Sequence, residues 1–99
     1  MNINIEPIHF TADQKLLDYI DAKVNKLGQF FDKIIDVDVK LRLENSGQIK
    51  DKIVDLKINV PGETLFISES NKTFEAATDA SVAVMKRQII KYKEGLRAY

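Results

Sequence analysis

Strict alternation of apolar and polar residues along two segments limits what this chain can fold into. From Val37 to Glu44 the sequence reads Val-Asp-Val-Lys-Leu-Arg-Leu-Glu, and from Val54 to Val60 it reads Val-Asp-Leu-Lys-Ile-Asn-Val. Successive side chains of a β-strand point to opposite faces, so each segment predicts a strand with one apolar and one charged face. A sheet built from such strands needs a cover on one face only.

Turn residues place two further strands around these segments. Residues 45–48 (Asn-Ser-Gly-Gln) indicate a turn between the alternating segments, and Pro61-Gly62 indicates a tight turn into a strand over residues 65–68. Residues 3–6 (Ile-Asn-Ile-Glu) also alternate, and the proline that follows them favours an edge position. The last three strands are therefore expected to form an antiparallel meander.

Two amphipathic helices are expected to cover the apolar face of this sheet. Thr11 with Gln14 three residues later forms a capping-box pattern, and Gly28 can end the helix that starts there. The apolar stripe of this first helix consists of Leu16, Leu17, Ile20, Val24 and Leu27. A second stripe, in a helix of about 24 residues from residue 73 onward, consists of Phe74, Thr78, Val82, Met85, Ile89, Tyr92 and Leu96.

The resulting order of elements, β-α-β-β-β-α, predicts a protein of the α+β class. We expect a two-layer sandwich with a four-stranded, mostly antiparallel sheet and both helices on one face. A chain of 99 residues is too short for two separate cores, so residues 1–99 are expected to form a single domain. The sequence has no apolar run of about 20 residues and its first residues do not have the pattern of a signal peptide, so we expect a cytoplasmic protein.

Residues that would support catalysis are scarce. The chain has no cysteine and a single histidine, His9, without an evident orienting partner. Its serines lack the neighbouring motifs of a nucleophile. The sequence therefore predicts that the protein is not an enzyme and that it uses no metal and no cofactor.

Charge is distributed unevenly although it balances over the whole chain. The fifteen Lys and Arg residues equal the fifteen Asp and Glu residues in number. Between residues 85 and 99, however, Glu94 is the only acid, beside the basic residues Lys86, Arg87, Lys91, Lys93 and Arg97. Lys23 and Lys26 would extend this basic surface if the two helices lie side by side. Such a surface is equally compatible with polyanion binding and with a solvated helix end whose cations favour the helix dipole.

Two aromatic residues follow the first helix directly. Phe30 and Phe31 lie next to its apolar stripe. Stacking on nucleic-acid bases is one possible role, but aromatic residues beside such a stripe are usually buried. We therefore expect them to close the end of the core.

Together these segments resemble the ribosome hibernation promoting factor and ribosome-associated translation inhibitor family. The first helix, over residues 16–27, carries an apolar pair followed by Lys23-x-x-Lys26-Leu27, with Phe31 nearby. The second carries residues 74–79 (Phe-Glu-Ala-Ala-Thr-Asp), then Met-Lys-Arg-Gln-Ile at 85–89 and Lys-Tyr-Lys at 91–93. Thr78 departs from the larger aliphatic residue usual in the family, and the aromatic at Phe74 comes one position early.

The resemblance implies a short, single-domain factor that binds the small ribosomal subunit and its ribosomal RNA in the messenger and transfer RNA channel. Such a factor blocks translation and preserves idle ribosomes. The RNA-binding residues that it implies, with Arg97 added on charge alone, are Lys23, Lys26, Lys86, Arg87, Lys91, Lys93 and Arg97. A membrane or a small-molecule substrate is not expected as a partner. A protein-interaction module of the same fold and, less favoured, a small-molecule-binding sandwich are the alternatives.

Overall fold

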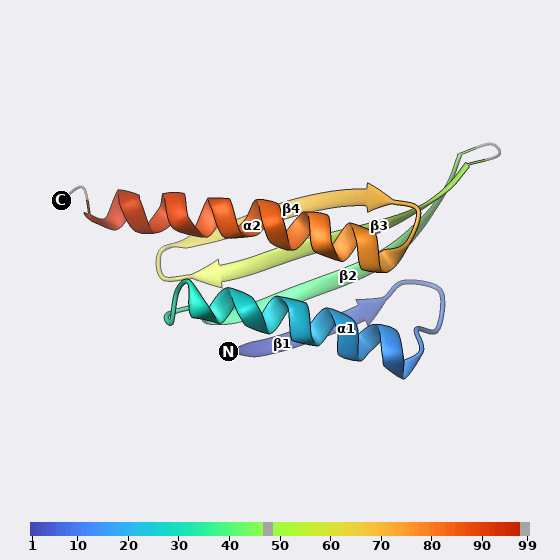
Figure 1. Cartoon of the computed structure of the whole chain (residues 1–99), viewed down its shortest axis with the longest axis horizontal. Coiled ribbons are helices and arrows are strands. Elements are labelled where there is room, and N and C mark those ends of the chain that lie inside the picture. The colour runs from blue at the N-terminus through green and yellow to red at the C-terminus, as the bar shows by residue number, and fades with distance from the viewer. Residues whose placement is uncertain (47–48, 98–99) are drawn as a thin grey trace.

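The computed structural model describes residues 1–46 and 49–97, with side chains described for residues 1–44 and 51–96. The turn predicted over residues 45–48 therefore lies partly outside the described residues. The elements follow the predicted order, and Figure 1 shows their arrangement. They are β1 (Asn2–Pro7), α1 (Gln14–Asn25), the 3₁₀ helix η1 (Lys26–Gln29), β2 (Asp36–Ser46), β3 (Ile49–Val60), β4 (Glu63–Asn71) and α2 (Phe74–Arg97).

The four strands form one mixed sheet in the order β1-β2-β3-β4. β2, β3 and β4 pair antiparallel, which confirms the predicted meander. β1 is an edge strand, as its proline suggests, and pairs parallel with β2. The parallel pairing follows from the connection, because a chain that crosses back through a helix enters the next strand in the same direction.

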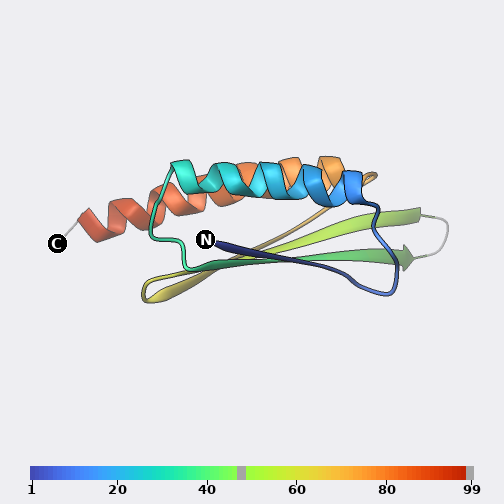
Figure 2. The same ribbon diagram turned by 90° about the horizontal axis from the view of Figure 1, so that it is seen from below.

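Both helices cover the same face of the sheet, as predicted and as Figure 2 shows. The alternating segments place their apolar residues under the helices, with Val39 opposite Leu56 in the register. Ile20 from α1 and Met85 from α2 are fully buried against this face. The hydrophobic effect thus fixes which face is covered, since a shift of a strand by one residue would turn its apolar side chains to the uncovered face.

The first helix begins two residues later than the capping pattern predicts. Asp13, not Thr11, is the N-cap, and its carboxylate accepts a hydrogen bond of 2.8 Å from the main-chain N–H of Leu16. The preceding Phe10 stacks on Phe74, with ring centroids 5.2 Å apart, and residues 11–13 are not helical. The prediction of Thr11 as the N-cap was therefore wrong. Gly28 lies within η1, so it does not end the α-helix itself.

The second helix has the predicted length of 24 residues, but its last turn is not covered. Thr73 caps its start, because the Thr73 hydroxyl accepts a hydrogen bond of 3.0 Å from the N–H of Ala76. Leu96, predicted as part of the buried stripe, is 54% exposed. Figure 2 shows the reason: α2 extends past the end of the sheet, so the sheet does not cover its C-terminal turn. No helix in the described part of the chain is long and apolar enough to cross a membrane.

Candidate nucleic-acid interface

The two helices lie side by side on the sheet (Figure 1). A groove lies between parts of their exposed sides. Lys23 comes from α1 and Lys26 from η1, and both line this groove opposite Val82 and Ala83 of α2. The groove has a volume of about 250 Å³ and is also lined by Gln29, Phe30 and Asp79. The structure therefore brings the basic residues of the first helix next to the second helix.

Phe30 connects the C-terminal end of the first helical segment to α2. The Lys86 ammonium lies 4.5 Å from the centroid of the Phe30 ring, a cation–π geometry. The Lys93 ammonium donates a hydrogen bond of 2.6 Å to the main-chain carbonyl of Phe30. Phe31 is buried and meets the ring of Tyr92 edge-on at 5.4 Å. The prediction that this pair closes the core is confirmed for Phe31, while Phe30 is half-buried with its ring near Lys86.

A second cluster joins the helices closer to the N-terminal end of α2. The Tyr19 hydroxyl lies 2.8 and 2.9 Å from the two carboxylate oxygens of Asp79, and the Lys23 ammonium lies 3.6 Å from one of them. Lys23 also lies 5.5 Å from the centroid of the Tyr19 ring. The hydrogen bond to Asp79, followed by burial and the charge of Asp79, raises the pKa of Tyr19 above its usual value. The phenol therefore remains protonated, and able to donate, at neutral pH.

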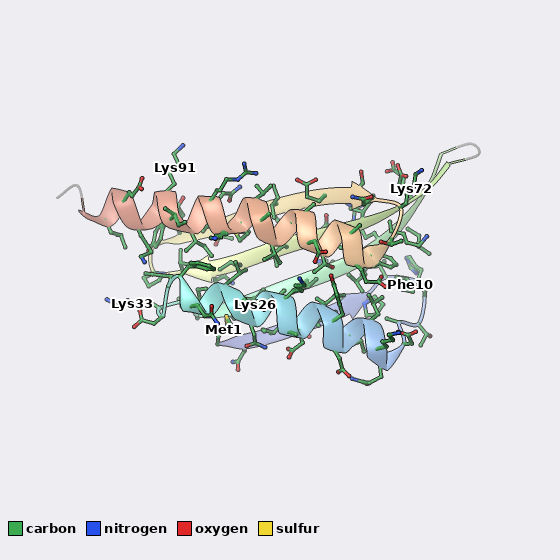
Figure 3. All side chains as sticks on the ribbon, in the orientation of Figure 1. Met1, Phe10, Lys26, Lys33, Lys72 and Lys91 are labelled. Atoms are coloured by element: carbon green, nitrogen blue, oxygen red, sulfur yellow. The ribbon has the colours of Figure 1, made fainter. Side chains whose placement is uncertain are left out.

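The basic residues of α2 fall on two sides of the helix. Lys86 and Lys93 are seven residues apart, close to two turns, so both project from the same side of α2, and both contact Phe30 just after η1. Together with Lys23 and Lys26, which line the groove, they form what we call the groove set. Arg87 and Lys91 are exposed on the other side, and we call them the outer pair. Figure 3 shows Lys91 directed away from α1. It lines a separate hollow with Glu63, Leu65 and Gln88. Arg97 lies in α2, but its side chain is outside the described part of the chain.

The opposite, uncovered face of the sheet carries charges of both signs that pair with one another. Arg42 and Ser68 both donate hydrogen bonds to the Asp55 carboxylate, at 2.6 and 2.7 Å. Phe66 is 56% exposed beside them. Although burial by itself would raise the pKa of Asp55, the hydrogen bonds from Arg42 and Ser68 lower it below its usual value. The two lysines at the centre of this face each lie opposite an acidic residue in the strand register, Lys40 opposite Asp55 and Lys57 opposite Asp38.

Neither a catalytic nor a metal site is evident in the part of the chain that the structure describes. His9 is exposed at the end of the first strand, with a positive φ of 63°, and no cluster of three or more His, Asp or Glu side chains could hold a metal. The interface does include two residues that sequence reasoning missed, Tyr19 and Asp79. The i, i+4 spacing of Tyr19 and Lys23 is visible in the sequence, but their contact with Asp79 depends on how the two helices pack.

A search of protein families and known proteins gives consistent matches. The family model described as "Sigma 54 modulation protein / S30EA ribosomal protein" matches residues 3–97. A ribosome hibernation promoting factor from Klebsiella oxytoca is 30% identical over 99 residues, covering all of both chains. One from Pseudomonas putida is 31% identical over 94 residues, covering 95% of this chain and 88% of its own.

Two solved structures share the fold. A ribosomal subunit interface protein from Coxiella burnetii superposes with a TM-score of 0.85 at 19% identity, over 95% of this chain and 99% of its own. The N-terminal domain of Protein Y from Thermus thermophilus superposes with a TM-score of 0.74 at 20% identity, over 93% and 99%. At these identities the likeness is evidence for the fold alone.

Proposed function

The chain belongs to the Sigma 54 modulation protein / S30EA ribosomal protein family, and on that premise we propose that it is a hibernation factor that silences idle ribosomes by occupying the small subunit. The site of binding in this proposal is the channel used by messenger and transfer RNA. The family is one of non-catalytic ribosome-binding factors, so the proposal needs no chemical step. It places the protein with ribosomes in the cytoplasm and requires no membrane and no small-molecule substrate.

The observation that best supports this proposal is the one-sided arrangement of positive charge. The groove set and the outer pair lie on α1, η1 and α2. On the uncovered sheet face, by contrast, the basic residues lie beside Asp55 or Asp38. Lys and Arg side chains that neutralise phosphates release condensed counterions, so binding of this kind weakens steeply as salt increases. Phosphate contacts position a protein on RNA without reading its sequence, and the fit of the two-helix surface to a folded RNA would supply selectivity.

Within this surface we propose that ribosomal RNA crosses both helices. The groove set would contact one stretch of backbone and the outer pair a neighbouring one, with Arg97 continuing the surface along α2. Lys93 contributes charge there although its ammonium already binds the carbonyl of Phe30. We also propose that residues 1–99 act as one binding domain, because both helices and all four strands share a single core.

Sedimentation with purified small ribosomal subunits tests the proposal. Binding of the wild-type protein should weaken as salt is raised from about 0.05 to 0.2 M. The double variants Lys26→Glu/Lys86→Glu and Arg87→Glu/Lys91→Glu should each lose at least about tenfold in affinity. The matched control Lys40→Glu/Lys57→Glu makes the same charge change on the uncovered sheet face, where both residues are exposed, and should bind like wild type.

A cell-free translation assay then tests silencing. The wild-type protein should inhibit synthesis, and the two helix-side variants should not. If binding depends neither on salt nor on the helix-side substitutions, the RNA-binding surface is refuted. If the protein binds subunits without inhibiting synthesis, the hibernation role is refuted.

The exposed aromatic residue on the sheet favours a second candidate function, docking of a protein partner. Phe66 lies in a shallow hollow of about 440 Å³ lined by Asp38, Lys40, Asp55 and Lys57. Exposed aromatics in charged surroundings are typical of interface anchors. Loss of ribosome binding in Phe66→Ser, but in neither helix-side variant, would favour this function over RNA binding.

A further inference from the structure

Two acidic residues of α2, Glu75 and Asp79, lie beside α1 on the N-terminal side of Lys86. Asp79 lies seven residues before Lys86, so the two side chains project from the same side of the helix, two turns apart. Asp79 lines the groove together with Lys23 and Lys26. An RNA backbone that approached Lys23 through this groove would therefore meet a carboxylate there.

The contacts of Asp79 are unequal. Its two oxygens accept hydrogen bonds from the Tyr19 hydroxyl at 2.8 and 2.9 Å, whereas the Lys23 ammonium stays 3.6 Å away. The Lys23 side chain is 36% exposed and the Asp79 side chain 50% exposed. Ion pairs this open to water contribute little to stability, so Lys23 can leave Asp79 at low cost. Tyr19 holds the carboxylate in place when it does.

We propose that Asp79 is an attenuating residue, which competes with RNA phosphates for Lys23 and so weakens the binding of RNA to this surface. The inference rests on the proposed function, because it assigns a role within the same RNA-binding surface. Any RNA phosphate that binds Lys23 must displace Asp79, so part of the binding energy is used to break this pair. The carboxylate thus lowers affinity for ribosomal RNA and for unspecific RNA alike.

The variant Asp79→Asn isolates the charge. Asparagine keeps a carbonyl oxygen that can accept the Tyr19 hydrogen bond, so the packing of the helices is retained while the competing charge is removed. Binding to poly(U), measured by fluorescence anisotropy near 0.15 M salt, should tighten about twofold to fivefold. Because Lys23 is then free to contact a phosphate, the plot of log affinity against log salt should steepen by about 0.7 for this single strand. Affinity for small ribosomal subunits should rise by a similar factor.

Two further variants distinguish this role of Asp79 from an effect of net charge and from a purely structural role. Glu69→Gln makes the same change in net charge on β4 and should leave poly(U) binding unchanged. Tyr19→Phe removes the hydroxyl that anchors Asp79, so the carboxylate is free to approach Lys23 and poly(U) binding should weaken. If Asp79 only held the helices together, Asp79→Asn and Tyr19→Phe would shift binding in the same direction.

The inference would be overturned if Asp79→Asn left the salt dependence of poly(U) binding unchanged. It would also be overturned if Glu69→Gln raised the affinity for poly(U) by the same factor. A gain in affinity for poly(U) without any gain in affinity for small ribosomal subunits would overturn the inference as well. Failure of the proposed function has a different signature, in which the wild-type protein binds neither subunits nor poly(U) in a salt-dependent way.

Discussion

The ammonium group of Lys93 donates a hydrogen bond of 2.6 Å to the main-chain carbonyl of Phe30, across the junction between η1 and α2. Phe30 follows the last residue of η1, where carbonyl groups lack partners within the helix. A basic residue that the charge pattern assigns to RNA binding therefore also holds the two helical segments together. Lys26 of the groove set is exposed to solvent instead.

Substitution of Lys93 should therefore reduce stability. Lys93→Gln removes a charge-assisted hydrogen bond from a partly buried carbonyl, which should cost about 1 to 2 kcal/mol of unfolding free energy. Urea denaturation followed by circular dichroism measures the loss. The control Lys91→Gln, on the exposed outer side of the same helix, should stay within about 0.5 kcal/mol of wild type. Equal stability of the two variants would show that the Lys93 bond contributes nothing.

Lys26 should show the reverse behaviour, with an effect on binding and none on folding. Lys26→Gln removes one exposed cation from the groove, so the salt dependence of ribosome binding should lose about 0.7 to 0.9 of its slope. Its unfolding free energy should match that of wild type. Lys33→Gln is the control, because Lys33 is exposed in the loop before β2 (Figure 3). A slope that falls equally in both variants would mean that net charge, not position, controls binding.

Asp55 should make stability depend on pH. Its pKa is lowered in the folded protein, since burial, which acts in the opposite direction, is outweighed by hydrogen bonds from Arg42 and Ser68. A carboxyl group with a lowered folded pKa stabilises the protein above its unfolded value of 3.8, and this contribution disappears as pH falls through the lower folded value.

Asp55→Asn should thus lower the unfolding free energy by about 1 to 2 kcal/mol at pH 7. The difference from wild type should be constant above about pH 5 and shrink steadily below pH 4. Chemical denaturation between pH 2.5 and 7 measures it. Asp38→Asn, on the same sheet face, serves as the control. A difference between Asp55→Asn and wild type that grows as pH falls would contradict the assigned direction.

The layout of the fold could be predicted from the sequence because it follows from local patterns. Alternation along Val37 to Glu44 and the spacing of Ile20, Val24 and Leu27 each depend on side chains a few residues apart. Those patterns are sufficient to assign the faces that become buried, and hence the layers. The start of α1 could not be placed in the same way, because Thr11 and Asp13 are both good caps and the stacking of Phe10 on Phe74 is a contact between distant residues.

The candidate interface was predictable only in part, because its contacts also join residues that are distant in the sequence. Its basic residues are visible as charge, but the sequence does not show which of them have intramolecular partners. The contacts of Lys93 with Phe30 and of Lys23 with Asp79 each join residues more than fifty positions apart. The two sides of α2 follow from helical geometry, and only the packing of α1 beside it distinguishes the groove set from the outer pair.

Thr78 offers a way to stabilise the protein. It is buried in α2, and its hydroxyl donates to the main-chain carbonyl of Phe74 at 2.7 Å. That carbonyl already accepts the main-chain hydrogen bond of the helix. The additional hydrogen bond therefore offsets only a small part of the free-energy cost of burying the hydroxyl. Thr78→Val should raise the unfolding free energy by about 0.5 to 1 kcal/mol. Thermal denaturation measures this, with Thr64→Val at an exposed strand position as the control; a lower melting temperature for Thr78→Val would show that the hydroxyl is needed.

The exposed last turn of α2 should tolerate substitution that the preceding turns do not. Ile89 and Leu96 lie seven residues apart on the same side of the helix, yet Ile89 is fully buried and Leu96 is 54% exposed. Ile89→Ala should cost about 2 to 4 kcal/mol, because it removes buried methylene groups and leaves a cavity. Leu96→Ala should cost less than about 0.5 kcal/mol, since the sheet does not extend beneath it. Urea denaturation of the two variants tests the comparison directly, and a similar cost at both positions would mean that the C-terminal turn packs against the sheet in solution.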